Sequence, residues 1–189
     1  MKILVRGSSI AAGFGVKRSY VDRLISDPDF SGWQIINSSS IKDNSFDCVW
    51  GFQKEIEPYS PDILVLHFGI DDAYFPVYRS EFKENLVQTV RLSRKLFDPV
   101  IILMTSHPFE DQYEMQMINI YYRTIREVAV DLSCELVPVH TYISGYLLEN
   151  NLSLYHFLLD DNRYPNEKGH DLYLEALKNK LLRLSKNFL

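Results

Sequence analysis

The sequence predicts an α/β fold in which helices cover both faces of one five-stranded parallel sheet. Short apolar runs alternate with longer amphipathic stretches, and neither a repeat nor a linker divides the chain. The strongest run, DILVLHF at 62–68, is continuously apolar, which is typical of strands that a parallel sheet buries on both faces. Such alternation is what β-α-β units require. We therefore expect residues 1–189 to form a single domain.

Each element follows from a local pattern. The predicted strands are apolar runs bounded mostly by Gly, Pro or Ser. They are residues 2–5, 33–37, 62–68, 99–105 and 134–139. The predicted helices have apolar residues at helical spacing, and several end at proline or begin at a capping residue. They are residues 19–27, 46–57, 80–97, 113–133 and 166–185.

Composition narrows the classes of function. The chain is 46% hydrophobic and 24% charged, as in an ordinary globular protein. Its net charge of −5 and the lack of a basic run argue against a nucleic-acid partner. Cys48 and Cys134 are far apart in sequence and make no metal-type spacing, which favours reduced thiols. No apolar run is long enough for a membrane span or a signal peptide, so we expect no membrane partner and a cytoplasmic location. We also expect no cofactor.

A site in such a fold is expected beyond the carboxyl ends of the strands. Four loops that follow strands meet this condition, and the loop before the last helix joins them if that helix packs against the first strand. They are residues 7–15, 37–45, 69–79, 105–111 and 158–166.

The first loop, RGSSIAAGFG, offers a candidate nucleophile. Gly7 permits a tight turn after the strand, the next residues are serines, and nearby backbone N–H groups can stabilise an oxyanion. On this loop alone, Ser8 and Ser9 fit better as residues that merely cap the chain's exit from the strand. The glycines at 7, 13 and 15 do not match a dinucleotide-binding pattern.

Two other loops carry carboxylates. Asp71 and Asp72 follow the third strand, where they fit either solvated capping groups or an Mg²⁺ site. Asp161 precedes the last helix, and Asn166 is a good residue to cap that helix.

Taken together, the loops resemble the SGNH (GDSL-type) serine hydrolases, a family of flavodoxin-like three-layer α/β/α sandwiches that act on acyl and acetyl esters. Its Gly-Asp-Ser block resembles residues 7–9, which implies that Ser9 is the nucleophile. Its Gly-x-Asn-Asp block resembles residues 69–72, with Gly69 first. Its Asp-x-x-His-Pro-Asn-x-x-Gly-His block resembles residues 161–170. The resemblance implies a small acylated substrate, for example an acylated carbohydrate, and leaves the oligomeric state open.

The departures from this family pattern fall on catalytic positions. Lys42 stands near the oxyanion glycine, where it keeps a backbone N–H but adds a side chain. Asp71 replaces an Asn whose amide would donate to the oxyanion; an ionised carboxylate has no proton to donate. Tyr164 replaces the histidine base that Asp161 would orient, and a phenol is protonated at neutral pH.

The sequence therefore leaves three interpretations open. The first is an esterase with Ser9 as nucleophile, Asp161, and an unusual base, either His107 after the fourth strand or an activated Tyr164. The second is a binding or assembly protein that has kept the fold and lost the chemistry. The third is a metal-dependent phosphoesterase that uses Asp71, Asp72 and His107, although these residues do not make a convincing set of metal ligands.

Overall fold

The computed structural model describes residues 1–186 and contains one sheet, with strand order β2-β1-β3-β4-β5 and every neighbouring pair parallel. The strands are β1 (Lys2–Gly7), β2 (Gln34–Asn37), β3 (Ile63–His67), β4 (Val100–Met104) and β5 (Glu135–Val137). This confirms the predicted five-stranded parallel sheet. β3 lies at the centre and is buried along its whole length, as its uninterrupted apolar sequence requires.

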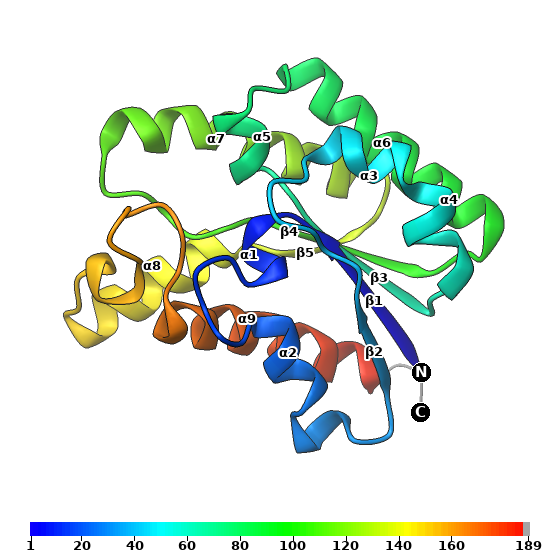
Figure 1. Ribbon diagram of the computed structural model, residues 1–189, viewed down its shortest axis with the longest axis horizontal. Helices are drawn as coiled ribbons and strands as arrows, with labels where there is room; N and C mark the ends of the chain where they lie inside the picture. Colours follow the sequence, from blue (N-terminus) through cyan, green and yellow to red (C-terminus); the bar gives the residue numbers. More distant parts are fainter. Residues whose placement is uncertain (187–189) are drawn as a thin grey trace.

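Helices cover both faces of the sheet and complete an α/β/α sandwich (Figure 1). One face carries α3 (Ser45–Trp50), α4 (Phe52–Glu55), α6 (Arg79–Leu96) and α7 (Gln112–Asp131), and the other carries α2 (Tyr20–Ile25) and α9 (Glu167–Ser185). α6 packs on both α3 and α7, and α2 packs on α9. α8 (Val139–Asn150) follows β5 and contacts α9. Short 3₁₀ turns, η1 (Pro28–Phe30), η2 (Glu57–Tyr59) and η3 (Leu154–Phe157), occupy connections.

The helices differ from the prediction in two ways. The predicted helix 46–57 is two helices, because Gly51 ends α3 and begins α4. α8 and two short helices, α1 (Ser9–Ala12) and α5 (Ile70–Tyr74), were not predicted. α1 and α5 have four and five residues, which is too short for a helical repeat of apolar residues to be visible. Each begins within three residues of a strand end, so the candidate loops after β1 and β3 are partly helical.

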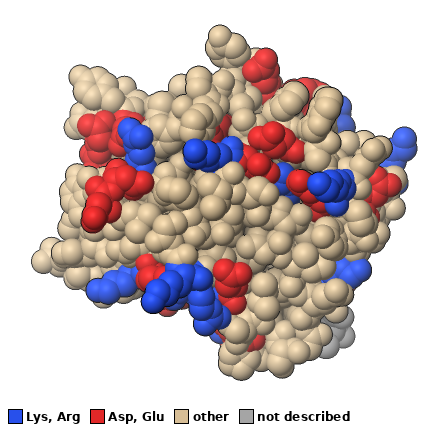
Figure 2. Space-filling model, in the orientation of Figure 1, with Lys and Arg blue, Asp and Glu red and all other residues tan. Residues whose placement is uncertain are grey.

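Ion pairs tie neighbouring elements together at the surface. Arg23 on α2 contacts both Glu167 and Asp171 on α9. On the side of the molecule that Figure 2 shows, acidic and basic side chains lie together in several groups, and uncharged surface separates the groups. No helix within residues 1–186 is both long and apolar enough to cross a bilayer.

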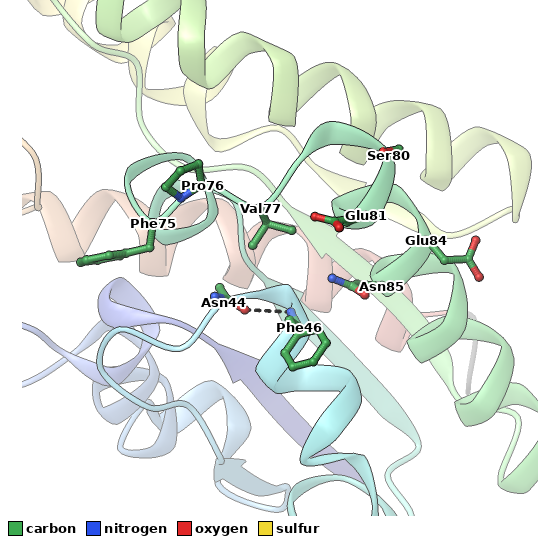
Figure 3. A pocket seen from close by; sticks show the side chains of 9 residues that line it. All are labelled: Asn44, Phe46, Phe75, Pro76, Val77, Ser80, Glu81, Glu84 and Asn85. Atoms are coloured by element: carbon green, nitrogen blue, oxygen red, sulfur yellow. Dashed lines mark hydrogen bonds between the residues drawn. The ribbon is translucent and has the colours of Figure 1, made fainter.

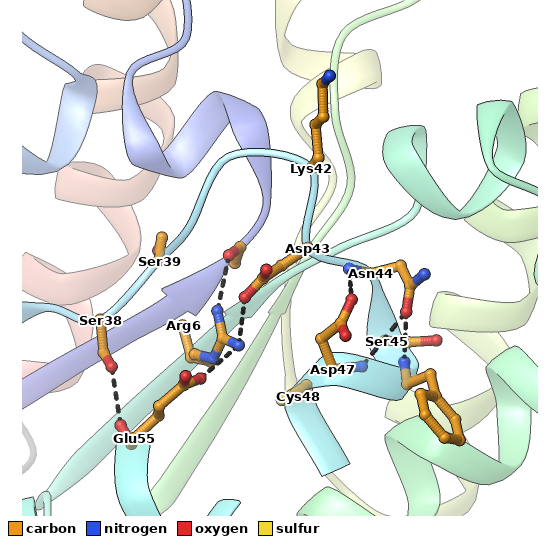
Figure 4. Close-up of polar contacts among 12 residues, drawn as sticks. Arg6, Ser38, Ser39, Lys42, Asp43, Asn44, Ser45, Asp47, Cys48 and Glu55 are labelled. Atoms are coloured by element: carbon orange, nitrogen blue, oxygen red, sulfur yellow. Dashed lines mark hydrogen bonds and ion pairs between the residues drawn. The ribbon is translucent and has the colours of Figure 1, made fainter. Parts of the chain in front are cut away.

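A basic side chain lies inside the fold. Arg6, in β1, is 0% exposed, and its guanidinium forms ion pairs with Asp43 at 2.6 Å and Glu55 at 2.5 Å (Figure 4). It also donates to the carbonyl of Gly7 and lies 5.8 Å from the ring centroid of Phe68. A buried guanidinium is tolerated only when carboxylates neutralise it. Arg6 therefore fixes the loop that carries Asp43, which is the loop after β2.

A second buried cluster lies between the sheet and α9. His67 bonds to the Tyr20 hydroxyl through Nδ1 and to the Ser106 hydroxyl through Nε2, and His107 bonds to the Tyr173 hydroxyl through Nδ1. Burial lowers the pKa of His67 and of His107 to about 3, because a charged imidazole would lose its hydration there. The core thus holds these imidazoles neutral.

We predict that Arg6→Met destabilises the protein by about 3 kcal/mol, because Asp43 and Glu55 lose their buried counter-ion. The matched control is Arg79→Met, which removes an exposed ion pair with Glu127 and should change the free energy of unfolding by less than about 1 kcal/mol. Urea unfolding measures both. Equal losses in the two variants would show that Arg6 does not anchor the loop.

We also predict that the protein loses stability as the pH falls below about 6.5, the ordinary pKa of histidine in an unfolded chain. The buried imidazoles have lower pKa values in the folded state, so the unfolded chain binds protons first. Each such histidine contributes up to about 1.4 kcal/mol of loss per pH unit until its folded pKa is reached. Asp72, whose pKa burial raises to about 6, opposes part of this loss.

The measurement is the free energy of unfolding at pH 7 and pH 5. His67→Gln should flatten the pH dependence relative to the wild type, whereas His156→Gln, at an exposed position, should leave it unchanged. If His67→Gln has the wild-type pH dependence, proton uptake by the buried imidazole is not its cause.

Candidate active site

Ser9 begins α1, directly beyond the carboxyl end of β1. The preceding turn requires Gly7: a Cβ there would lie 2.6 Å from the carbonyl oxygen of His67 on the neighbouring strand. Ser9 is 1% exposed, and its two polar groups, the hydroxyl and the backbone N–H, face other loops of the same sheet edge. The position predicted for a nucleophile is therefore a buried junction of loops.

Lys42 contributes its backbone to this junction. Its N–H donates to Ser9 Oγ at 2.9 Å, and its φ of +68° lies in the left-handed region that favours glycine. The lysine side chain is exposed and points away from Arg6 and Asp43 (Figure 4). Residue 42 thus presents the N–H that a glycine would present, and the Arg6–Asp43 ion pair holds the next residue in place.

Asp71 is the centre of the site. It follows Gly69, whose φ is +127°, and its carboxylate is 0% exposed. Oδ2 accepts from the Ser9 N–H at 3.0 Å, and Oδ1 accepts from the Ser9 hydroxyl at 3.0 Å. Oδ1 also accepts from the Tyr164 hydroxyl at 2.9 Å. Three donors from two distant segments therefore converge on one carboxylate.

Tyr164 is placed by the loop before α9. Asp161 Oδ1 accepts from the backbone N–H groups of Arg163 and Tyr164, and the Tyr164 ring packs 4.8 Å from that of Phe14. Burial and the adjacent Asp71 charge raise the pKa of Tyr164 well above its usual range. The phenol therefore keeps its proton and donates a hydrogen bond to Asp71. This is the opposite of the activated base that the first interpretation offered beside His107.

Asp72 joins the loops rather than facing Ser9. Its Oδ1 accepts from the Ser45 N–H at 2.8 Å and its Oδ2 from the Gly69 N–H at 2.9 Å. The Ser45 hydroxyl in turn accepts from the Asn85 amide of α6. Asp72 therefore connects α3, α5 and α6 at the edge of the site.

The structure does not place His107 against Ser9. Its Nδ1 bonds to the Tyr173 hydroxyl at 2.7 Å, its ring stacks on Phe109, and the residue is 1% exposed. Within residues 1–186 the side chain of Ser9 bonds to Asp71 and Lys42, and no imidazole is among its partners. The expectation of His107 as a substitute base is therefore not supported by this geometry.

The metal interpretation lacks a set of ligands. Asp71 and Asp72 direct their oxygens at N–H and O–H donors, and His107 faces Tyr173. In the described part of the chain, three or more His, Cys, Asp or Glu side chains do not gather in a metal-binding arrangement.

Sequence reasoning found the positions in the site but missed two of its interactions. Arg6 interrupts an otherwise apolar strand, which signals a buried charge, but its partners lie 37 and 49 residues away. The bond between Tyr164 and Asp71 joins residues 93 apart. For this bond, the available signal was that Asp71 and Tyr164 replace the Asn and the His of the family pattern, in loops expected at the same sheet edge.

Comparison with solved structures supports the fold. An acetylxylan esterase from Geobacillus stearothermophilus is 21% identical, with a TM-score of 0.77 over 93% of this chain and 91% of that one. An α/β hydrolase enzyme from the metagenome of Lake Arreo, Spain, is 20% identical, with a TM-score of 0.79 over 93% and 92%. A search of curated proteins gives no significant match.

The comparison with family models extends over most of the sequence. The GDSL-like lipase/acylhydrolase model matches residues 5–172, from within β1 to the first turns of α9, and so includes every loop of the site. This chain therefore belongs to the GDSL-like lipase/acylhydrolase family.

Proposed function

We propose that the protein is an ester hydrolase in which Asp71, rather than a histidine, is the base for Ser9. The observation that carries this proposal is the 3.0 Å hydrogen bond from the Ser9 hydroxyl to Asp71 Oδ1. A general base must lie within about 2.6–3.2 Å of the proton that it removes. Among the partners of Ser9, Asp71 is the ionisable one.

The first step transfers one proton and forms one bond. Ser9 Oγ attacks the acyl carbon, its proton moves to Asp71 Oδ1, and the carbonyl electron pair moves onto the carbonyl oxygen. Collapse of this intermediate expels the alcohol, which takes the proton back from Asp71 and leaves an acyl group on Ser9. The oxygen of a water molecule then attacks the acyl carbon while one of its protons moves to Asp71. The bond between Ser9 Oγ and the acyl carbon breaks, which releases the carboxylic acid, and Ser9 Oγ takes the proton back from Asp71.

Proton transfer also changes what Asp71 can do for the oxyanion. Before attack, its negative charge would repel the developing oxyanion; after it takes the proton, it is a neutral carboxyl group with an O–H to donate. The Lys42 N–H and the Ser9 N–H are further donors at the same place. The site therefore carries one negative charge throughout the step, and this charge moves from Asp71 to the oxyanion.

This arrangement predicts slow turnover. An ordinary carboxylate has a pKa near 4, against about 6.5 for imidazole, so it is the weaker base at neutral pH. General-base catalysis is strongest when the pKa lies near the working pH. Tyr164 also donates a hydrogen bond to Oδ1, the oxygen that would receive the Ser9 proton.

The proposed substrate is an acyl or acetyl ester, with a carbohydrate as the alcohol part. Family membership supports the ester, and the structural similarity to an acetylxylan esterase supports an acetyl group on a sugar. The unusual base favours small, activated esters over hindered ones, since a weak base limits the attack step.

One observation favours a second candidate, a binding protein without hydrolysis. In the resting structure the Ser9 N–H donates to Asp71 Oδ2, so an oxyanion donor is already occupied by an anion, and Ser9 is 1% exposed. A site locked in this way would bind an ester and leave it intact.

Hydrolysis of 4-nitrophenyl acetate separates the two candidates. The wild type should show slow activity that Ser9→Ala abolishes, and Asp71→Asn should reduce it by about 10²–10⁴-fold, because the base is lost. An asparagine would improve the oxyanion site, so a hydrolase with its base elsewhere predicts a gain for the same variant. Asp160→Asn, which changes an exposed acid in the last loop, is the matched control and should retain wild-type activity.

The double variant Asp71→Asn/Tyr164→His restores the family's residue types at both positions and should exceed the wild-type rate. If the wild type is no faster than Ser9→Ala and only the double variant hydrolyses the ester, the Ser9–Asp71 mechanism is wrong and the binding protein is correct.

A further inference from the structure

A hollow of about 530 Å³ lies beside the candidate active site, between the start of α3 and the start of α6 (Figure 3). Its volume is in the range of small-molecule sites. It is lined by Asn44, Phe46, Phe75, Pro76, Val77, Ser80, Glu81, Glu84 and Asn85. None of these residues takes part in the proposed chemistry.

Aromatic side chains around this hollow are left in water. Phe46 is 56% exposed and Phe75 is 51% exposed, and both line the hollow. Trp50, one helical turn beyond Phe46 on α3, is 84% exposed, and the two rings stack with centroids 6.2 Å apart. Burial of such rings normally stabilises a fold, so clustered exposed aromatics mark a surface that binds something flat and partly apolar.

Polar side chains complete the hollow. Figure 3 shows Asn85 on α6 pointing toward α3 on the opposite wall, and the Glu81 carboxylate near Val77, where it accepts from the Tyr78 N–H at 3.2 Å. The described lining holds two carboxylates, Glu81 and Glu84, and neither Lys nor Arg. This charge disfavours an anionic ligand, and a long acyl chain would desolvate the carboxylates without replacing their hydrogen bonds. Neutral hydroxyl groups, in contrast, donate readily to carboxylate and amide oxygens.

We propose that this hollow binds a neutral sugar ring, which is the alcohol part of the ester that the active site hydrolyses. A pyranose combines a face of C–H groups, which packs on aromatic rings, with a rim of hydroxyls, which suits the carboxylates and amides. This inference rests on the proposed function for its connection to catalysis, but the binding itself does not require hydrolysis.

The hollow and the active site share structural support. Asn44 lines the hollow two residues after Lys42, whose N–H meets Ser9. Ser45 donates its N–H to Asp72 and accepts at its hydroxyl from Asn85, so the walls of the hollow are bonded to the loop after β3. A sugar held between Phe46 and Glu81 is therefore held on the same rigid frame as the reacting serine.

The test is calorimetric titration with a panel of unsubstituted neutral tetrasaccharides: xylotetraose, cellotetraose, mannotetraose and chitotetraose. At least one should bind, and Phe46→Ala and Glu81→Gln should each weaken its affinity by about tenfold. The matched control is Tyr155→Ala, which removes a 53% exposed aromatic ring from η3, outside the hollow, and should bind as the wild type does. Absence of binding to every member, or equal affinity in all variants, overturns the inference.

Kinetics keep this test separate from that of the proposed function. If the wild type hydrolyses esters, Phe46→Ala should raise KM for the mono-acetylated form of the bound tetrasaccharide and leave 4-nitrophenyl acetate unaffected. A rise in KM for 4-nitrophenyl octanoate instead would assign the hollow to an acyl chain and overturn the inference. If no ester is hydrolysed but the tetrasaccharide binds through Phe46 and Glu81, the proposed chemistry fails while the sugar site stands.

Discussion

The carboxylate of Asp71 is the constraint on which the site depends. It is fully buried, and it is stabilised by the N–H and the hydroxyl of Ser9 and by the hydroxyl of Tyr164. A buried charge without such donors would be strongly destabilising, whereas charge-assisted hydrogen bonds are among the strongest in proteins. The three bonds also join the loops after β1 and β3 to the loop before α9. Electrostatics and loop geometry are therefore parts of one interaction.

The two unusual residues of the site make physical sense as a pair. A histidine at position 164 would compete with Ser9 for the acidic side chain, and an asparagine at position 71 would leave the phenol of Tyr164 without an anionic acceptor. Together, Asp71 and Tyr164 satisfy each other with a bond of 2.9 Å. The buried Arg6 supports the same site, because its ion pair anchors Asp43 next to the strained backbone of Lys42. The altered positions thus form an internally consistent polar network rather than a set of independent losses.

The sequence predicts the sheet well because the strands are marked by runs of apolar residues, and β3 is buried along its whole length. It also predicts that Ser9, Asp71 and Tyr164 lie at one edge, because parallel strands bring their carboxyl ends together. It could not show that Asp71 and Tyr164 touch, since that depends on the path of a loop 93 residues away. Nor could it show that His107 is turned toward Tyr173, because a histidine after a strand can point into the core or into the crevice. The short helices α1 and α5 could not be predicted, because each is too short to show a helical repeat of apolar residues.

The central claim is that Asp71 makes Ser9 nucleophilic, and covalent labelling tests it without reference to any natural substrate. The protein would be treated with a fluorophosphonate, which reacts with an activated serine by loss of fluoride, and the labelled residue identified by mass spectrometry. We predict slow, single labelling at Ser9 in the wild type and its loss in Asp71→Asn. Labelling that is undiminished in Asp71→Asn, or a wild type in which Ser9 does not react, would contradict the claim.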